Sequence, residues 1–379
     1  MATPEHPRLL VLTPAADLYG SDRALLMALP EICSRFRVTL VSAADGPMLQ
    51  NAREIGAEVI VSPDWALRRR GLSVTALPGT AARVLATARL LRRLHREDPF
   101  DVIYANTVAN ALLPLLPRVI PRPLVVHVRE VPRDRGRMAR LLFAAVERVA
   151  DRVICNSRFT AGLVAKLTPG VEDRLHVVPD GIQPLDPVAP SASDGVLDVV
   201  CVGRIHPKKG QAVLIEATRI AATKGRNWRV HLWGEALPEH RDLYHGLLRQ
   251  VDRYRLGEVV RWHGFSSDIR PMYEGMDVAV VPSVLPEEFS LVTAEAQMVG
   301  LPVVATGPGG PSDILVEGRT GLIVPPGDPP ALADGLMAIE DLPDRVTWGR
   351  AGRERTLANF STERYAPAVA TELVAALAR

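Results

Sequence analysis

Short hydrophobic runs alternate with longer amphipathic stretches along most of the chain. The first run, RLLVLT at 8–13, is hydrophobic almost throughout, and a helical pattern from Ser21 places Leu25, Leu26 and Leu29 on one face. Strands that are hydrophobic on both faces are typical of parallel sheets covered by helices on both sides. The pattern therefore predicts an α/β protein built on parallel sheets.

The predicted strands form two series. The first series continues with the runs at 36–43, 57–62, 101–106, 123–128, 151–157 and 174–181, and the second comprises 197–204, 228–234, 259–264, 277–283 and 301–306. A segment rich in Pro and Ser, 184–195, separates them and is interpreted as a linker. We expect two Rossmann-like, doubly wound domains, 1–185 and 186–360, that face each other across a cleft, with a C-terminal helix at 361–379 that packs back on the first domain.

The composition is that of a globular protein, with 47% hydrophobic and 23% charged residues among 379. These values exclude intrinsically disordered and collagen-like chains. No run approaches the roughly 18 uncharged residues that span a bilayer, and the first residues lack the apolar core of a secretory signal. The three cysteines lie far apart, which fits reduced thiols better than a metal site. We expect a soluble, cytoplasmic protein.

The net charge of +2 conceals a difference between the halves. Residues 1–185 carry 25 basic and 18 acidic side chains, whereas residues 186–379 carry 20 and 25. Only four of the 45 basic residues are lysines, and two of these, Lys208 and Lys209, are adjacent. A split of this kind suggests domains with different partners.

The segment VGRIHPKKG at 202–210 is the strongest local feature. A predicted strand ends near Gly203, and Lys209 and Gly210 open a helix, so that Arg204 and Lys209 could converge on one anion at the helix start. The alternative is a pair of solvated cations, which the helix dipole makes slightly unfavourable at this end. An anion site is the favoured interpretation.

A second segment, 282–306, carries two carboxylates eight residues apart. Glu287 lies in the loop after a predicted strand, Ser290 caps a helix that starts with Leu291 and Val292, and Glu295 lies within that helix. The helix start offers N–H donors to a phosphate, and Glu295 could accept two hydrogen bonds from a ribose. Taken alone, the pattern is better explained by solvated carboxylates at a helix start, which Ser290 and the helix dipole would favour. The third segment, GPGGPSDIL at 307–315, is a Gly-rich turn and is weak evidence alone.

Together these segments resemble the retaining glycosyltransferases of family 4, which have the two-domain GT-B fold. The resemblance covers most of the chain and includes GSDR at 20–23, VVPDGI at 177–182, WHGF at 262–265 and GLIVPPGD at 321–328. It implies an enzyme that moves a sugar from a UDP- or GDP-sugar to a hydroxyl of a glycan, glycolipid or small molecule, with UDP preferred. Such enzymes act in polysaccharide biosynthesis.

The resemblance also implies roles for individual residues. Arg204 and Lys209 would hold the diphosphate, Glu295 the ribose, and Glu287 the hydroxyls of the donor sugar. The remaining residues would line the sugar, phosphate or base: Gly20, Ser21, His127, Gly264, Phe265, Ser290, Leu291 and Val292. His127 ends the strand at 123–128, and without the resemblance a core imidazole satisfied by the backbone is the preferred interpretation. The usual Gly-Gly is Gly20-Ser21 here, and Ser290 and Asp313 stand where Gly and Glu are common.

The chain has no Asp-x-Asp motif, the carboxylate pair with which metal-dependent transferases bind Mg²⁺ or Mn²⁺. We therefore expect transfer without a metal or other cofactor. Two rival functions share the architecture: a nucleotide-sugar epimerase, which needs no acceptor, and a non-catalytic partner subunit. The intact set of Arg204, Lys209, Glu287 and Glu295 argues against the partner subunit.

The arginines of the first half are clustered in three places: Arg68–Arg70, a helix with Arg83, Arg89, Arg92, Arg93 and Arg96, and a loop with Arg133, Arg135, Arg137 and Arg140. Leu85, Leu90, Leu91 and Leu94 could add an apolar stripe to that helix. One interpretation is peripheral contact with the inner face of an anionic membrane that carries a lipid-linked acceptor. The other is a solvated surface. Nucleic-acid binding is disfavoured because aromatic residues make up only 5%.

Overall fold

The structure, a computed structural model, describes residues 6–18, 20–66, 77–132, 137–189, 191 and 195–378. The chain divides into two compact units, and each is described here by itself. The first unit comprises Met1–Gly181 and Thr362–Arg379, and the second comprises Ile182–Ser361. The division therefore falls at 181 and 361, whereas the sequence pattern placed it at 185 and 360.

The first unit is built on a seven-stranded parallel sheet in the order β3-β2-β1-β4-β5-β6-β7. Its strands are β1 (Arg8–Thr13), β2 (Arg37–Ser42), β3 (Glu58–Val61), β4 (Val102–Ala105), β5 (Leu124–Val128), β6 (Arg152–Cys155) and β7 (Leu175–Val177). The order reverses between β1 and β4, so the point where the two halves of a doubly wound sheet meet lies there.

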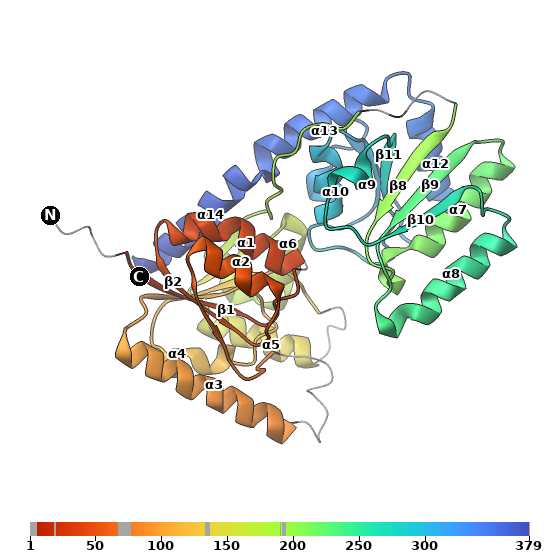
Figure 1. Cartoon of the computed structure of the whole chain (residues 1–379). Helices are drawn as coiled ribbons and strands as arrows, with labels where there is room; N and C mark the ends of the chain where they lie inside the picture. The colour runs from red at the N-terminus through yellow and green to blue at the C-terminus, as the bar shows by residue number, and fades with distance from the viewer. Residues whose placement is uncertain are drawn as a thin grey trace. The chain divides into compact units, whose positions relative to one another are not determined.

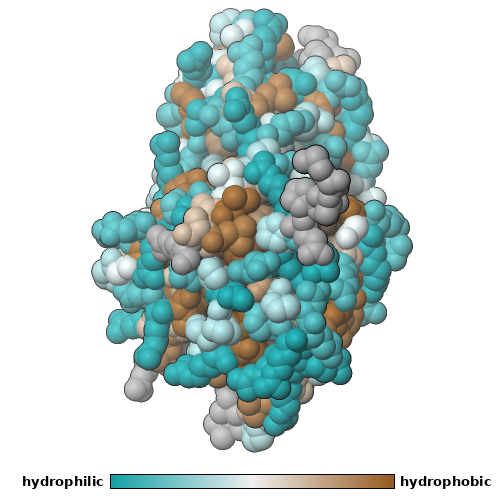
Figure 2. Space-filling view, turned by 90° about the vertical axis from the view of Figure 1, so that its left-hand side faces the viewer, coloured by the Kyte–Doolittle hydropathy of each residue, from teal (hydrophilic) through white to brown (hydrophobic). Residues whose placement is uncertain are grey.

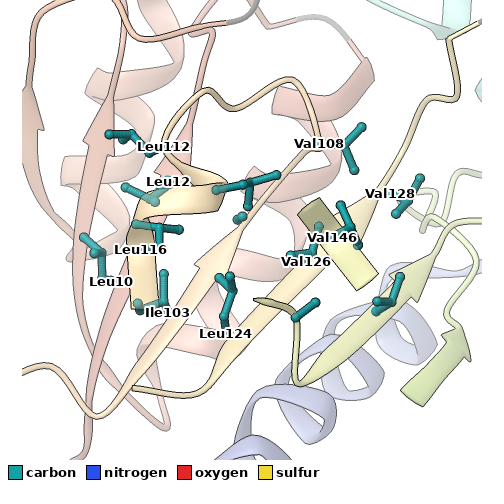
Figure 3. Close-up of a cluster of buried hydrophobic side chains, with 14 of the residues drawn as sticks. Leu10, Leu12, Ile103, Val108, Leu112, Leu116, Leu124, Val126, Val128 and Val146 are labelled. Carbon is teal, nitrogen blue, oxygen red and sulfur yellow. The ribbon is translucent and has the colours of Figure 1, made fainter. Parts of the chain in front are cut away.

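Helices cover both faces of this sheet. They are α1 (Gly20–Cys33), α2 (Pro47–Ile55), α3 (Leu77–Glu97), α4 (Leu116–Val119), α5 (Arg137–Val149), α6 (Arg158–Leu167) and α14 (Thr362–Leu377), with 3-10 turns at Leu113–Leu115 and Pro169–Arg174. In Figure 1, α1, α2 and α14 lie on one side of the sheet and α3 and α4 on the other. The core of the α3 side joins strand residues such as Leu10, Ile103 and Leu124 to Leu116 and Val146 (Figure 3).

The second unit has a six-stranded parallel sheet in the order β10-β9-β8-β11-β12-β13. Its strands are β8 (Leu197–Val202), β9 (Trp228–Trp233), β10 (Val260–Gly264), β11 (Val278–Val281), β12 (Val303–Thr306) and β13 (Gly321–Val324). Its helices are α7 (Gln211–Thr223), α8 (Arg241–Arg253), α9 (Arg270–Tyr273), α10 (Leu291–Met298), α11 (Pro311–Ile314), α12 (Pro329–Glu340) and α13 (Arg345–Phe360), with 3-10 turns at Pro207–Lys209 and Pro238–His240.

Both faces of the second sheet are also covered. Residues of α7, α8 and α12 pack on one face, and α9 and α10 pack on the other (Figure 1). Here the strand order reverses between β8 and β11. Each unit is therefore a Rossmann-like fold with its own reversal point, and the fold class expected from the sequence is confirmed.

One strand was not predicted. β13 is only four residues long and comprises GLIV, the first half of the motif GLIVPPGD at 321–328. It pairs with β12 at the edge of the sheet, and two of its residues are only partly buried. A short edge strand that follows a turn has too few hydrophobic positions for its period to show in the sequence.

Candidate functional site

Two of the residues expected to bind the donor lie beyond the carboxyl ends of two neighbouring strands of the second unit. Lys209 follows β8, and Glu287 follows β11, the two strands between which the sheet order reverses. In open parallel sheets ligands bind at this point. The fold therefore brings together two segments that are far apart in the sequence.

Lys209 and Glu287 form an ion pair. The Lys209 Nζ donates to Glu287 Oε1 at 2.6 Å, and the Ser283 hydroxyl donates to the same oxygen at 2.6 Å. The Glu287 side chain is 9% exposed and that of Lys209 is 23% exposed. Glu287 is therefore a buried carboxylate, and its interpretation as a solvated loop residue is wrong.

The electrostatics of this pair favour the ionised form of Glu287. Burial alone would raise the pKa of Glu287, but the ammonium of Lys209 and hydrogen bonds from Lys209, Ser283 and Ser290 outweigh it and lower the pKa to about 2. The carboxylate therefore stays ionised throughout the physiological pH range, and it can accept hydrogen bonds but cannot act as an acid.

Backbone contacts fix the two loops against each other. The Val284 N–H donates to the Lys208 carbonyl at 2.9 Å. Gly210 has φ 71°, and a Cβ at this position would collide with the carbonyl of Pro282. A glycine after Lys209 thus allows the start of α7 to touch the end of β11, and this contact sets the distance between Lys209 and Glu287.

The Gly-rich turn at 307–310 packs against the same loop. The Gly310 N–H donates to the Glu287 carbonyl at 2.7 Å, and a Cβ on Gly310 would collide with the backbone of Phe289. The third segment, which is weak evidence by itself, therefore supports the Glu287 loop directly.

Helix α10 begins beside this loop. Ser290 precedes its first residue, but its side chain makes no hydrogen bond to the helix backbone, contrary to the expected cap. Its hydroxyl instead hydrogen bonds with that of Thr293 at 2.8 Å. Ser290 has φ 91°, a left-handed conformation that is uncommon for a residue with a side chain. Leu291 and Val292 form the first turn, and Glu295, only 3% exposed, lies within the helix.

The other expected residues of this unit line the same edge of the sheet. Arg204 is exposed directly after β8, and Gly264 ends β10 with φ 72°. Gly264 also lines a cavity of about 440 Å³ whose walls include Glu235, Tyr244 and Trp262. Phe265 follows with 68% of its surface exposed.

In the first unit, His127 is fully buried at the end of β5. Its Nδ1 lies 2.7 Å from the Tyr104 hydroxyl and 3.3 Å from Arg129 Nη2, whereas its Nε2 has no hydrogen-bond partner among the described residues. Burial lowers the pKa of His127 well below its ordinary value, and the positive charge of Arg129 lowers it further. The imidazole is therefore neutral.

Sequence reasoning missed the polar cluster around this histidine. Arg129 forms a buried ion pair with Asp180 and donates to the Tyr365 hydroxyl at 2.7 Å and to Asn106 Oδ1 at 3.1 Å. The Asn106 amide in turn donates to the Ser21 carbonyl at 3.3 Å. Ser21 and the exposed Gly20 form the start of α1, so the fold brings Gly20, Ser21 and the His127 cluster to one edge of the first sheet.

The arginine-rich segments are only partly described. Arg68–Arg70, Arg133 and Arg135 lie outside the described residues, as does the side chain of Arg137. The arginines of α3 are exposed, but the expected apolar stripe on that helix is wrong because Leu91 is fully buried in the core and Leu94 packs against it. Leu85 is the exception, at 50% exposed. No helix among the described residues is long and apolar enough to cross a membrane.

Comparisons with known proteins agree with this arrangement. The model of "Glycosyltransferase Family 4" matches residues 23–184, and that of "Glycosyl transferases group 1" matches residues 197–341. The human alpha-1,3/1,6-mannosyltransferase ALG2 is 25% identical over 95% of this chain and 94% of its own length. The lipopolysaccharide core biosynthesis mannosyltransferase LpsB of Rhizobium meliloti is 30% identical, over 45% of this chain and 50% of its own length.

A solved structure shows the same fold. The Anabaena protein Alr3699/HepE, crystallised with UDP and glucose, superposes with a TM-score of 0.81 over 97% of this chain and 100% of its own, at 24% identity. The two family models lie one in each unit and together match most of the chain. The chain therefore belongs to family 4 of the glycosyltransferases, the group 1 enzymes that transfer a sugar from a nucleotide-sugar donor.

Proposed function

We propose that this enzyme transfers a hexose from a nucleoside diphosphate sugar to an acceptor hydroxyl, with retention at the anomeric carbon and without a metal ion. The observation that carries the proposal is the buried Lys209–Glu287 pair at the reversal point of the second sheet. A fixed cation and a fixed carboxylate side by side suit a donor whose diphosphate is anionic and whose sugar offers hydroxyl donors.

Lys209 and Arg204 hold the diphosphate in this proposal. As the bond to the sugar breaks, negative charge grows on the leaving phosphate, and cations already in place stabilise it. The N–H groups at the start of α10, near Ser290, Leu291 and Val292, add donors. No protein nucleophile is required, because the leaving phosphate itself takes the proton of the acceptor hydroxyl, which enters from the same face.

Glu287 and Glu295 select the sugar parts of the donor. Glu287 accepts hydrogen bonds from the hydroxyls of the transferred sugar, and its low pKa keeps it in the accepting form. Glu295 binds the ribose, while the backbone at Gly264 and Phe265 lines the base. A neutral His127 lies beside the sugar, and Gly20 and Ser21 approach the β-phosphate.

We propose a UDP-sugar before a GDP-sugar, on the support of the similarly folded HepE, which was crystallised with UDP. A thermal-shift screen of UDP- and GDP-sugars tests this preference, since a ligand that binds only the folded protein raises its Tm. A larger shift with GDP-sugars than with UDP-sugars would overturn it.

Metal independence is tested by activity in EDTA. Positive side chains take the place of the cation in this proposal, so the initial rate should be unchanged by EDTA. Complete loss of activity in EDTA, restored by Mg²⁺, would refute the proposal.

Retention is tested by the anomeric configuration of the product, which NMR shows. An enzyme that converts the nucleotide sugar when no acceptor is present would instead be an epimerase.

The proposed acceptor is a lipid-linked glycan reached by peripheral contact with an anionic membrane. Five exposed arginines on α3, together with Leu85 and the 66% exposed Leu141 of α5, support this proposal. Figure 2 shows one face of the molecule, on which hydrophilic residues predominate and hydrophobic residues are interspersed. Salt-sensitive sedimentation with anionic vesicles, lost in Arg92→Glu/Arg93→Glu, is the expected result, and equal sedimentation of that variant would contradict it.

A further inference from the structure

The His127 cluster contains one group that fixes which ring nitrogen carries the proton. Nδ1 of His127 faces two groups, the Tyr104 hydroxyl at 2.7 Å and Nη2 of Arg129 at 3.3 Å. A hydroxyl can donate or accept, but a guanidinium only donates. A proton on Nδ1 would therefore point at another donor, and the neutral ring avoids this only by carrying its proton on Nε2.

Arg129 is itself held from several sides. The carboxylate of Asp180 pairs with it, and the hydroxyl of Tyr365 and the amide oxygen of Asn106 accept from it. Asp180 in turn accepts from the Asn156 amide at 3.2 Å. These groups come from four separate segments of the chain, and all are buried. The guanidinium therefore has little freedom to move away from His127.

We propose that Arg129 is a positioning residue, which holds the His127 imidazole with its proton on Nε2 and presents that N–H as a fixed donor to a sugar hydroxyl. Nε2 is buried and without a partner among the described residues, as a donor reserved for a ligand would be. The inference rests on the proposed function and deepens it, because it assigns His127 a donor role and excludes a role as general base. A nitrogen that carries a proton has no lone pair with which to accept one.

One member of the cluster, Tyr365, comes from a distant part of the chain. It lies on α14, a segment that follows the whole second unit in the chain, and its hydroxyl contacts Arg129 directly. α14 is also held to the first sheet by Arg152, whose Nε donates to Glu372 at 2.8 Å. That second pair joins the same helix to the same sheet but does not belong to the His127 cluster, so it provides a matched control.

The test is the protonation state of His127 in the full chain, observed by long-range ¹H–¹⁵N correlation of protein labelled in its nine histidines. The His127 signals are those that disappear in His127→Gln. We expect Nδ1 to resonate as an unprotonated nitrogen and Nε2 as a protonated one. In Arg129→Met/Asp180→Leu, which removes the buried pair without leaving a lone charge, the two tautomers should mix.

Activity provides the second measurement. We expect kcat/KM to fall about tenfold in Arg129→Met/Asp180→Leu, the size of effect of one misplaced hydrogen bond. Arg129→Lys, which keeps a charged donor, should retain the tautomer and recover part of the rate. The control Arg152→Met/Glu372→Leu should leave both the tautomer and kcat/KM unchanged.

Two results would overturn the inference: a proton on Nδ1 in the native chain, or an unchanged tautomer in Arg129→Met/Asp180→Leu. If that variant does not fold, the native chain and Arg129→Lys still decide, because the inference requires the Nε2 proton in both. The NMR measurement needs no substrate. A native chain that turns over no nucleotide sugar would thus defeat the proposed function, while the tautomer would be decided independently.

Discussion

The two units place charge differently at the carboxyl ends of their sheets. In the second unit the ion pair at the reversal point, Lys209–Glu287, retains partial access to solvent through the lysine. In the first unit the ion pair Arg129–Asp180, which follows β5 and β7, is almost completely buried, and Nε2 of the neutral His127 beside it has no hydrogen-bond partner among the described residues. One sheet edge therefore offers charges to a ligand, whereas the other uses charges to orient a neutral donor.

The largest effect should come from removing the charge of Glu287. Glu287→Gln keeps the size of the side chain but removes its negative charge and exchanges one acceptor oxygen for an N–H donor. Turnover should fall by about 10²–10³-fold, as when one preorganised polar group of an active site is lost. Steady-state kinetics with the donor found by thermal shift measure this. Turnover within about threefold of the native value would remove Glu287 from the mechanism.

The contrast between the pairs predicts a different result for Asp180. Asp180→Asn leaves the buried Arg129 without its counter-charge, and breaking a buried pair in this way typically costs about 3–5 kcal/mol. Urea unfolding should show a correspondingly lower midpoint. Glu287→Gln should lose less stability than Asp180→Asn. The Lys209 that it leaves without a counter-charge is more exposed to solvent than Arg129. Equal losses in the two variants would contradict the difference in burial.

Acid should weaken the second unit through Glu287. Its pKa is lowered to about 2 in the folded chain, below the value of about 4.3 expected when unfolded. The unfolded chain therefore binds a proton first, and the contribution of Glu287 to stability, present above pH ~4.3, is lost as the pH falls toward 2. This contribution amounts to about 3 kcal/mol. It is absent in Glu287→Gln, so the free energy of unfolding of that variant should fall less between pH ~4.3 and pH 2. If the free energy of unfolding fell in parallel with pH in the native chain and in Glu287→Gln, this role of Glu287 would be refuted.

The smallest effect on stability should come from Arg204. This residue is exposed, so Arg204→Met should change the free energy of unfolding by no more than about 0.5 kcal/mol. The KM for the donor should nevertheless rise, because a cation for the diphosphate is lost. Calorimetry and donor titration measure the two quantities. A large loss of stability would show that Arg204 acts structurally, as Arg129 does.

The sequence predicts the sheets well because parallel strands that are covered on both sides need hydrophobic residues at nearly every position. Twelve of the thirteen strands in the described part of the chain correspond to such runs, and the exception, β13, is short and lies at an edge. Lys209 and Glu287 could also be found, since each follows a predicted strand. The direct ion pair between these two residues could not be predicted, because the hydrophobic pattern shows neither the strand order nor the contact at Gly210.

The His127 cluster was beyond sequence reasoning for another reason. Its members, which include Tyr104, Arg129, Asp180 and Tyr365, are scattered between the fourth strand and α14. A tyrosine on the buried face of an amphipathic helix has the pattern of a core residue. The sequence does not show whether its hydroxyl also accepts a hydrogen bond from a buried arginine. The one available signal was Arg129 directly after a hydrophobic strand, where a buried charge requires a partner.

The position of Tyr365 has a consequence for biosynthesis. During translation the first unit emerges with its sheet and most of its helices, but α14 is made only after the second unit. A ribosome-bound chain that lacks α14 therefore has Arg129 without its tyrosine hydroxyl and an uncovered strip of the first sheet. The first unit reaches its final state only after α14 has been synthesised and has left the ribosome, so its folding is completed after the second unit has been made.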